Sequence, residues 1–210
     1  DRIESRGLGD VYKRQNPLAP KPVKFDRKQM EAIEAEILAV LKIGRLITPD
    51  FVRGEAATLR DAVTKNGWPA LEKCRGKIMF CLDNEGAHRD NYLKGNLTLE
   101  KRLLFASVGA TEPAAAWMKR NDPVQGFEEI QKLVKAGFMV RTRADANTVE
   151  ARSNDSSRSL KALASGAQFV STDFPDKVPR ISDYEVRLPG RVVARANPVS
   201  APELKGKAIK

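Results

Sequence analysis

The stretch FMVRTR at residues 138–143 and the stretch QFVST at residues 168–172 set the fold class of this chain. Each contains an apolar run of the kind that forms a short buried strand. Between them, residues 157–165 have the pattern of a short helix that ends at Gly166, and glycine is typical of the position after a helix. A strand, a helix and a second strand in this order predict a parallel β/α unit.

The same alternation extends toward the N-terminus. KIMFCL at residues 77–82 is an almost continuous apolar run, as expected of a strand buried on both faces, and LLFA at 103–106 is another strand candidate. Helices are predicted from about Lys28 and over residues 55–65, 112–120 and 124–136. We expect four parallel strands in sequential spatial order, at about 77–83, 102–107, 138–143 and 168–172. The pattern leaves open whether they form an open doubly wound sheet or half of an eight-stranded barrel.

Composition indicates one ordinary domain. At 210 residues and 41% hydrophobic content, the chain is long enough to bury a sizeable core. No apolar run approaches the roughly 20 residues that span a bilayer, so no transmembrane helix is predicted. The formal charge of +10 is concentrated at the ends, since residues 1–28 and 184–210 each carry a net charge of +4. We expect solvated tails rather than a nucleic-acid surface, because no basic patch is interleaved with aromatic residues.

Four segments are expected along the chain. Residues 1–15 show no periodicity, and DVYKRQ at 10–15 resembles a translated sequencing-adapter remnant, so we interpret them as a non-native tail. Residues 16–28 contain three prolines and are interpreted as an extended linker. The α/β part is expected over residues 29–190, and a basic C-terminal tail over residues 191–210.

Charged side chains stand where the predicted strands end, which is where (β/α) barrels hold their functional residues. Asp83 and Glu85 follow the first strand, and carboxylate oxygens suit a hard cation such as calcium. Arg141 and Arg143 alternate along the third strand and therefore project from one face, as two arginines that bind a phosphate would.

Structural roles are the alternative for several side chains. The two arginines of the third strand are also consistent with interior side chains paired with Asp145 or Asp173. Cys81 lies inside an apolar run and is interpreted as a small buried hydrophobe. Trp68 and Trp117 are interpreted as packing residues rather than as a membrane anchor.

Five separated segments form a pattern that is more specific than any single motif. They are RLITPD (45–50), GKIMFCLDN (76–84), KRNDP (119–123), VRTRADA (140–146) and ALASGAQFVSTDFP (162–175). In this order they resemble the calcium-dependent phosphatidylinositol-specific phospholipase C family of bacteria and fungi, over about residues 22 to 200. The last segment is shared with glycerophosphodiester phosphodiesterases and alone identifies only the superfamily.

The resemblance implies the C-terminal half of a (β/α)8 TIM barrel. In the family a bound calcium ion stabilises charge on the phosphate while the inositol 2-hydroxyl attacks phosphorus, which gives diacylglycerol and a cyclic inositol phosphate. Asp83 matches an acidic residue that binds calcium in related enzymes, and Glu85 is a second candidate. A phospholipid or glycerophosphodiester substrate, peripheral membrane contact, no nucleic-acid partner and a secreted or periplasmic location are implied as well.

The family uses two histidines as general base and general acid, and both come from strands upstream of the residues present here. This sequence contains one histidine, His88, which we interpret as a surface-loop residue. We therefore assign no catalytic residue and expect the chain alone to be inactive. The alternatives are a glycerophosphodiester phosphodiesterase and a non-enzymatic relic that binds anions.

Half a barrel has a further consequence for the state of the chain in solution. It leaves two strand edges unpaired and an apolar interior uncovered. Unpaired edges and uncovered apolar surface both favour association. We therefore expect this chain to be oligomeric or poorly soluble.

Overall fold

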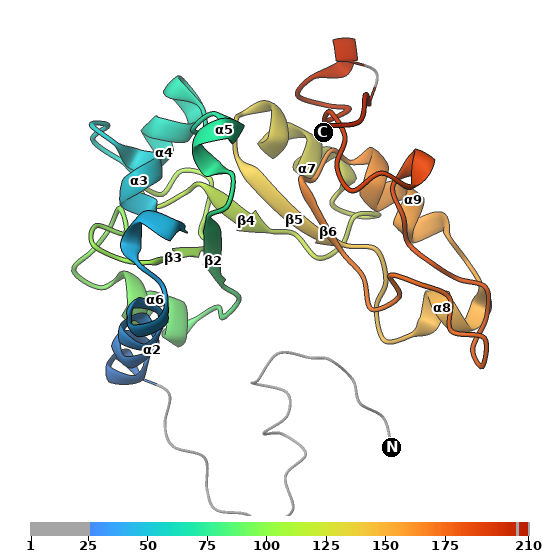
Figure 1. Cartoon of the computed structure of the whole chain (residues 1–210), viewed down its shortest axis with the longest axis horizontal. Helices are drawn as coiled ribbons and strands as arrows, with labels where there is room; N and C mark the ends of the chain where they lie inside the picture. Colours follow the sequence, from blue (N-terminus) through green and yellow to red (C-terminus); the bar gives the residue numbers. More distant parts are fainter. Residues whose placement is uncertain (1–25, 205, 210) are drawn as a thin grey trace, which may run out of the picture.

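Six short strands form two parallel sheets in the computed structural model, which describes residues 26–204 and 206–209. They are β1 (Leu46–Ile47), β2 (Ile78–Leu82), β3 (Leu104–Ala106), β4 (Trp117–Lys119), β5 (Met139–Arg143) and β6 (Phe169–Ser171). The first sheet has the order β1-β2-β3 and the second has the order β4-β5-β6. Between β3 and β4, the Lys119 N–H donates a hydrogen bond to Ser107 Oγ at 3.0 Å. Within each sheet the strands follow one another in sequence order, and Figure 1 shows β4, β5 and β6 side by side.

The four predicted strands are all present and parallel to the strands they pair with, but β3 and β5 lie in different sheets and do not pair with each other. The four strands correspond to β2, β3, β5 and β6, and each ladder that joins them to a neighbour is parallel. The result is a mixed α/β fold with two three-stranded parallel sheets and several helices, which is compatible with part of a barrel.

The predicted helix over residues 112–120 is wrong. Its last residues form β4, which pairs with β5 so that Lys119 stands beside Arg141. The run Ala114–Ala116 precedes this strand, and all three alanines are buried. Alanine has the highest helix propensity, but here the packing of a buried segment between two strands overrides it. The two-residue strand β1 was also not predicted, since it is too short to produce a pattern.

Helices connect the strands and lie on the outer side of the two sheets (Figure 1). They are α2 (Arg27–Val40), α3 (Pro49–Arg53), α4 (Leu59–Asp61), α5 (Leu71–Cys74), α6 (Ala87–Leu93), α7 (Phe127–Lys135), α8 (Val149–Ser153) and α9 (Ser157–Ala164). Shorter helical turns occur at η2 (Ile43–Arg45), η3 (Ala62–Asn66), η4 (Pro189–Arg191) and η5 (Pro202–Leu204). The predicted helix over 55–65 corresponds to α4 and η3, and the one over 124–136 corresponds to α7.

Burial alternates along β5, and this alternation decides which side chains are available for a site. Val140 and Thr142 are fully buried, and α7 and α9 pack on this strand. Met139, Arg141 and Arg143 are half-buried. Since successive side chains of a strand point to opposite faces, the two arginines project away from the buried face.

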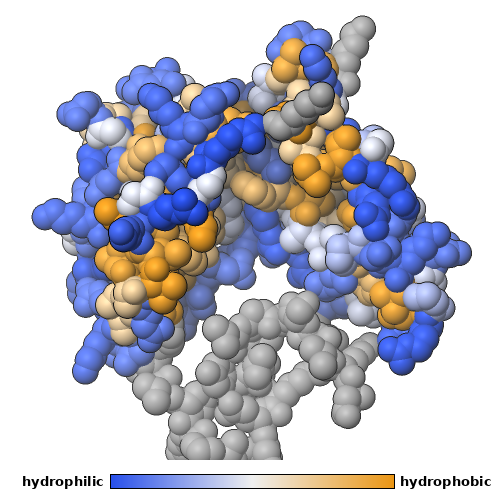
Figure 2. All heavy atoms as spheres, in the orientation of Figure 1, coloured by the Kyte–Doolittle hydropathy of each residue, from blue (hydrophilic) through white to orange (hydrophobic). Residues whose placement is uncertain are grey.

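The expectation that the strand at 77–82 is buried on both faces is wrong. Only Leu82 of β2 is buried, and Ile78 is 45% exposed. Phe169 of β6 is likewise 51% exposed. The described residues supply helices for one side of the sheets, so apolar side chains on the other side remain partly uncovered. Figure 2 shows apolar side chains on the surface of both halves of the molecule.

A buried polar network fixes α2 to the first sheet. The Glu34 carboxylate accepts hydrogen bonds from the Tyr92 hydroxyl at 2.5 Å, from Arg102 Nη1 at 2.9 Å and from the Leu103 N–H at 2.8 Å. The Tyr92 hydroxyl in turn accepts from the Leu104 N–H at 2.9 Å. A buried carboxylate with three donors is well compensated, so this network positions the start of β3.

The structure describes most of the C-terminal segment but not the first 25 residues. The predicted non-native tail at 1–15 and most of the predicted linker at 16–28 lie outside the described residues. In the C-terminal segment, Asn197 Nδ2 donates to the Gly166 carbonyl at 2.7 Å, and the Ala196 N–H donates to the Lys207 carbonyl at 2.7 Å. Among the described residues, no helix has both the length and the apolar character needed to cross a membrane.

Candidate functional site

Asp83 and Glu85 lie in the turn after β2, and both contact the same cation. Lys119 Nζ is 3.3 Å from Asp83 Oδ1 and 3.3 Å from Glu85 Oε1, and it donates a hydrogen bond to the Asp83 carbonyl oxygen at 2.5 Å. The Lys119 side chain is 10% exposed, whereas the side chains of Asp83 and Glu85 are 72% and 62% exposed. The two acids are therefore brought together around an ammonium group that is nearly buried.

Two arginines extend this cluster along β5. The register of the second sheet places Arg141 beside Lys119 and Arg143 beside Ser171. Arg141 Nη1 donates a hydrogen bond to Asn121 Oδ1 at 2.6 Å, so the residue two positions after β4 orients this guanidinium. The C-terminal ends of β2, β4 and β5 thus bring together two acids and three cations.

The arginines are only partly neutralised. The pKa of Arg141 is lowered, mainly because the side chain is partly buried and also because Arg143 is nearby. The negative charges of Asp83 and Asp173 act in the opposite direction and raise this pKa. Within the described residues, no ion pair joins Arg141 or Arg143 to a carboxylate. Half-buried guanidinium groups that are not paired directly with a carboxylate attract an anion.

Asp145 does not pair with the arginines. It is buried, and its carboxylate accepts hydrogen bonds from the Thr172 hydroxyl and, at 3.0 Å, from the Asp173 N–H. The strand ends at Arg143, so the alternation along β5 does not extend to Asp145. This carboxylate holds the turn after β6 in place, and the structural alternative of an Arg–Asp145 pair is not observed.

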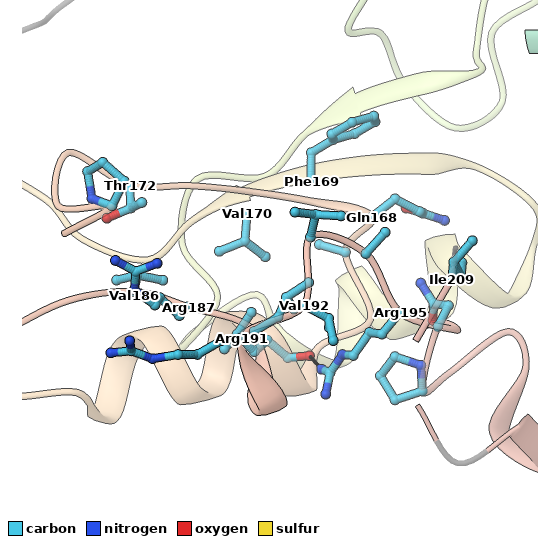
Figure 3. Close-up of a pocket in the computed structure, with 18 residues that line it drawn as sticks. Gln168, Phe169, Val170, Thr172, Val186, Arg187, Arg191, Val192, Arg195 and Ile209 are labelled. Atoms are coloured by element: carbon cyan, nitrogen blue, oxygen red, sulfur yellow. Dashed lines mark hydrogen bonds between the residues drawn. The ribbon is translucent and has the colours of Figure 1, made fainter. Parts of the chain in front are cut away.

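A cavity of about 710 Å³ lies elsewhere, along β6 and the C-terminal segment (Figure 3). Val170 and Val192 contribute to its apolar lining, and Arg187 and Arg195 belong to its border. Both arginines are already engaged, Arg187 with Glu185 at 2.7 Å and Arg195 with the Leu163 carbonyl at 2.9 Å. The charged cluster at the strand ends is therefore the better candidate for a site that binds a charged substrate.

Comparison with protein families agrees with the chemistry of this cluster. The family model described as "Phosphoinositide phospholipase C, Ca2+-dependent" matches residues 9–198. The chain belongs to this family. No curated protein and no solved structure gave a significant match. The family resemblance drawn from the five sequence segments is thereby confirmed.

Calcium is the metal that the name of this phospholipase C family implies, and the chemistry of the acid pair suits it. Two carboxylates and one backbone carbonyl oxygen converge on one cation, the Lys119 ammonium, and oxygen donors of this kind are those that calcium prefers. Among the described residues, no cluster of three or more Asp, Glu, His or Cys side chains gathers at one point. Calcium takes roughly six to eight oxygens, so this turn would supply only part of a calcium shell, and the remaining oxygens would have to come from elsewhere.

This member of the phospholipase C family has a single histidine, His88, that could act as a general acid or base. His88 lies in the first turn of α6 and is half-buried, so its interpretation as a surface-loop residue is wrong. The polar residues around it form a helix, and Gly86, with a φ of 60°, is the residue that caps its N-terminus. Cys81 is not an alternative nucleophile, because burial and the charge of Asp83 raise the pKa of its thiol to about 12.

Two residues of the cluster, Lys119 and Asn121, were not identified as site candidates from the sequence. Both belong to the segment KRNDP at 119–123, which was recognised only as part of the family pattern. Their position at the end of a strand was hidden by the mistaken helix at 112–120. An apolar run that ends in a charged residue was the signal present in the sequence, as it was at Asp83.

Proposed function

We propose that this chain supplies the phosphodiester-binding part of a calcium-dependent phospholipase C that cleaves phosphatidylinositol to diacylglycerol and a cyclic inositol phosphate. The observation that carries the proposal is the placement of an acid pair after β2 and of two incompletely neutralised arginines on β5, joined by Lys119 of β4, which contacts both acids and pairs with Arg141. Membership in the phosphoinositide phospholipase C family supports the choice of a lipid substrate.

Each group of the cluster has a role in this proposal. Asp83 and Glu85 would hold calcium, which when bound would stabilise negative charge on the phosphate. Arg141 and Arg143 bind phosphate oxygens or inositol hydroxyls through the parallel donors of their guanidinium groups. Asn121 keeps Arg141 in position through the hydrogen bond at 2.6 Å.

Turnover requires more than this chain contains. The reaction needs one group to take the proton of the attacking hydroxyl and another to protonate the leaving group, and the sequence has a single histidine. We therefore propose that the chain alone binds the phosphodiester without cleaving it. The same observation favours, as a second candidate, a non-enzymatic protein that binds anions through Arg141 and Arg143.

Vesicle binding tests the proposal. The full chain is sedimented with vesicles of phosphatidylcholine, with or without added phosphatidylinositol, in the presence of calcium or of a chelator. We expect binding only with phosphatidylinositol and calcium, loss of that binding in Arg141→Gln, and unchanged binding in Arg152→Gln, whose side chain contacts Thr148, the residue before α8, instead.

The outcomes separate the candidates. Binding to phosphatidylinositol that persists with the chelator supports the calcium-independent anion binder. Equal binding to both kinds of vesicle rules out headgroup recognition. Release of cyclic inositol phosphate by the chain alone would show that a single histidine is enough and would overturn the proposal of inactivity.

A further inference from the structure

The Lys119 ammonium occupies the centre of the oxygen cluster that the proposed function assigns to calcium. Its contacts are the Asp83 carbonyl oxygen at 2.5 Å, Asp83 Oδ1 at 3.3 Å and Glu85 Oε1 at 3.3 Å. All three of these oxygen atoms belong to the turn after β2, and all three contact Lys119 Nζ. A nearly buried ammonium with three oxygen contacts stands where a metal ion would otherwise be.

The backbone of Lys119 is held by hydrogen bonds, so the contact of its ammonium group with Asp83 and Glu85 starts from a fixed position. Its N–H donates to Ser107 Oγ at 3.0 Å, and its residue pairs with Arg141 in the β4–β5 ladder. The aliphatic part of the side chain is enclosed, since the side chain is 10% exposed. A lysine held in this way presents its charge to the acid pair as a tethered cation.

We propose that Lys119 is an internal counter-cation that holds Asp83 and Glu85 together and competes with calcium for them. The inference rests on the proposed calcium role of the two acids. Two cations repel each other strongly at a separation of a few ångströms, so the ammonium and a divalent ion cannot share the same oxygens. Calcium binding therefore requires the ammonium to leave the cluster.

This competition has two consequences for the chain. Without metal, the charges of the acid pair are compensated, and the turn from Asp83 to Glu85 keeps its shape. When calcium binds, breaking the contacts of Lys119 offsets part of the free energy of binding. The affinity for calcium is therefore weaker than the same oxygen atoms would give without Lys119. Lys119 thereby sets the calcium concentration at which the site fills.

Calorimetric titration of the full chain with calcium tests the inference. Lys119→Met preserves the length and the enclosed aliphatic part of the side chain but removes the charge. We expect calcium to bind Lys119→Met about tenfold more tightly than wild type, since each displaced ion pair contributes up to about a fivefold factor. Lys119→Arg keeps a permanent charge and should retain the weak affinity of wild type. Lys132→Met removes an exposed charge on α7 and should also behave as wild type.

Three further results show whether the competition or the calcium assignment itself is wrong. Asp83→Asn combined with Lys119→Met should lose the tighter binding, and retention of it would place the metal elsewhere and overturn the inference. If wild type binds calcium and Lys119→Met binds no more tightly while its circular dichroism spectrum is unchanged, the competition is refuted and the calcium role of the acids stands. If neither folded protein binds calcium at millimolar concentration, the calcium assignment itself fails, and the inference fails with it.

Discussion

Two arginines project from the same face of β5, but their surroundings differ. Arg141 is oriented by Asn121 and lies beside Lys119, whereas Arg143 lies beside Ser171 and forms no ion pair within the described residues. A guanidinium without a carboxylate partner keeps its parallel N–H donors available for two oxygens of one phosphate. Arg143 is therefore the residue at which shape, rather than charge, should matter most for phosphate recognition.

Replacing Arg143 by lysine separates these two properties. Arg143→Lys keeps the positive charge and loses the planar pair of donors, so we expect affinity for an inositol phosphate headgroup to fall about tenfold, the loss of one charged hydrogen bond. Calcium affinity should not change, since Arg143 contacts neither Asp83 nor Glu85. Both affinities can be measured by calorimetry, with Arg180→Lys at an exposed position as the control. Headgroup binding equal to that of wild type would show that Arg143 is not a phosphate ligand.

At the scale of single residues, the sequence was informative where a charged residue follows an unmistakable strand. Asp83 and Arg141 could be placed because the apolar runs next to them have a strand pattern. Lys119 could not, because the alanines before it favour a helix when propensity alone is considered. The role that we propose for Lys119 also depends on a contact with Asp83, which lies 36 residues earlier in the chain, and no local pattern encodes such a distance.

At the scale of elements, the predictions were right for segments in which pattern and turn residues agreed. The helical spacing predicts an apolar face of α7 with Phe127, Ile130, Leu133 and Val134, and the last three are buried whereas Phe127 is half-buried. The sequence TPD at 48–50 is typical of a helix start, and Thr48 caps α3 by accepting a hydrogen bond from the Phe51 N–H at 3.1 Å, with Pro49 at the first helical position. The prediction failed for β4, since burial between neighbouring strands is a tertiary property.

The turn between α7 and β5 depends on a glycine, and this gives a prediction for stability. Gly137 has a φ of +93°, and a Cβ atom there would lie 2.5 Å from the Val63 carbonyl oxygen. Its own carbonyl also accepts a hydrogen bond from Trp68 Nε1 at 3.0 Å. Gly137→Ala combines a left-handed backbone with a backbone clash, so we expect the free energy of unfolding to fall by about 2–3 kcal/mol.

The matched control for this prediction is Gly44→Ala. A Cβ atom at Gly44 meets nothing within 4 Å, and its φ is not in the left-handed region. We expect a change of about 0.5–1 kcal/mol or less there, and in the stabilising direction if the unfolded chain loses freedom. Urea denaturation followed by tryptophan fluorescence measures both variants. Equal stabilities for the two would show that the region around Val63 relaxes to accept the side chain.

At the scale of the whole molecule, the order of the strands was predictable and the completeness of the sheet was not. Right-handed crossovers place successive parallel strands side by side, and this order is observed within each sheet, from β1 to β3 and from β4 to β6. Within the described residues, β1 pairs only with β2, and β6 pairs only with β5. Each of these two strands therefore has one edge without a ladder partner, and the apolar cavity shown in Figure 3 lies alongside β6.

These features predict that the chain associates with itself. Unpaired strand edges next to exposed apolar side chains are sites at which chains pair. Phe169 on β6 is 51% exposed, so a charge at this position should discourage pairing along the edge. We expect light scattering coupled to size-exclusion chromatography to give an oligomer for wild type and a larger monomer fraction for Phe169→Lys.

A second exposed apolar residue distinguishes pairing at the edge from a general gain in solubility. Leu160 on α9 is 63% exposed, but it lies on a helix, where no strand edge is available. Leu160→Lys adds the same charge and removes a comparable apolar surface, so any effect of net charge should appear equally in both variants. If association depends on the β6 edge, Leu160→Lys should remain as oligomeric as wild type. A wild-type chain that elutes as a sharp monomer peak and unfolds cooperatively would show that the open edges do not control its state in solution.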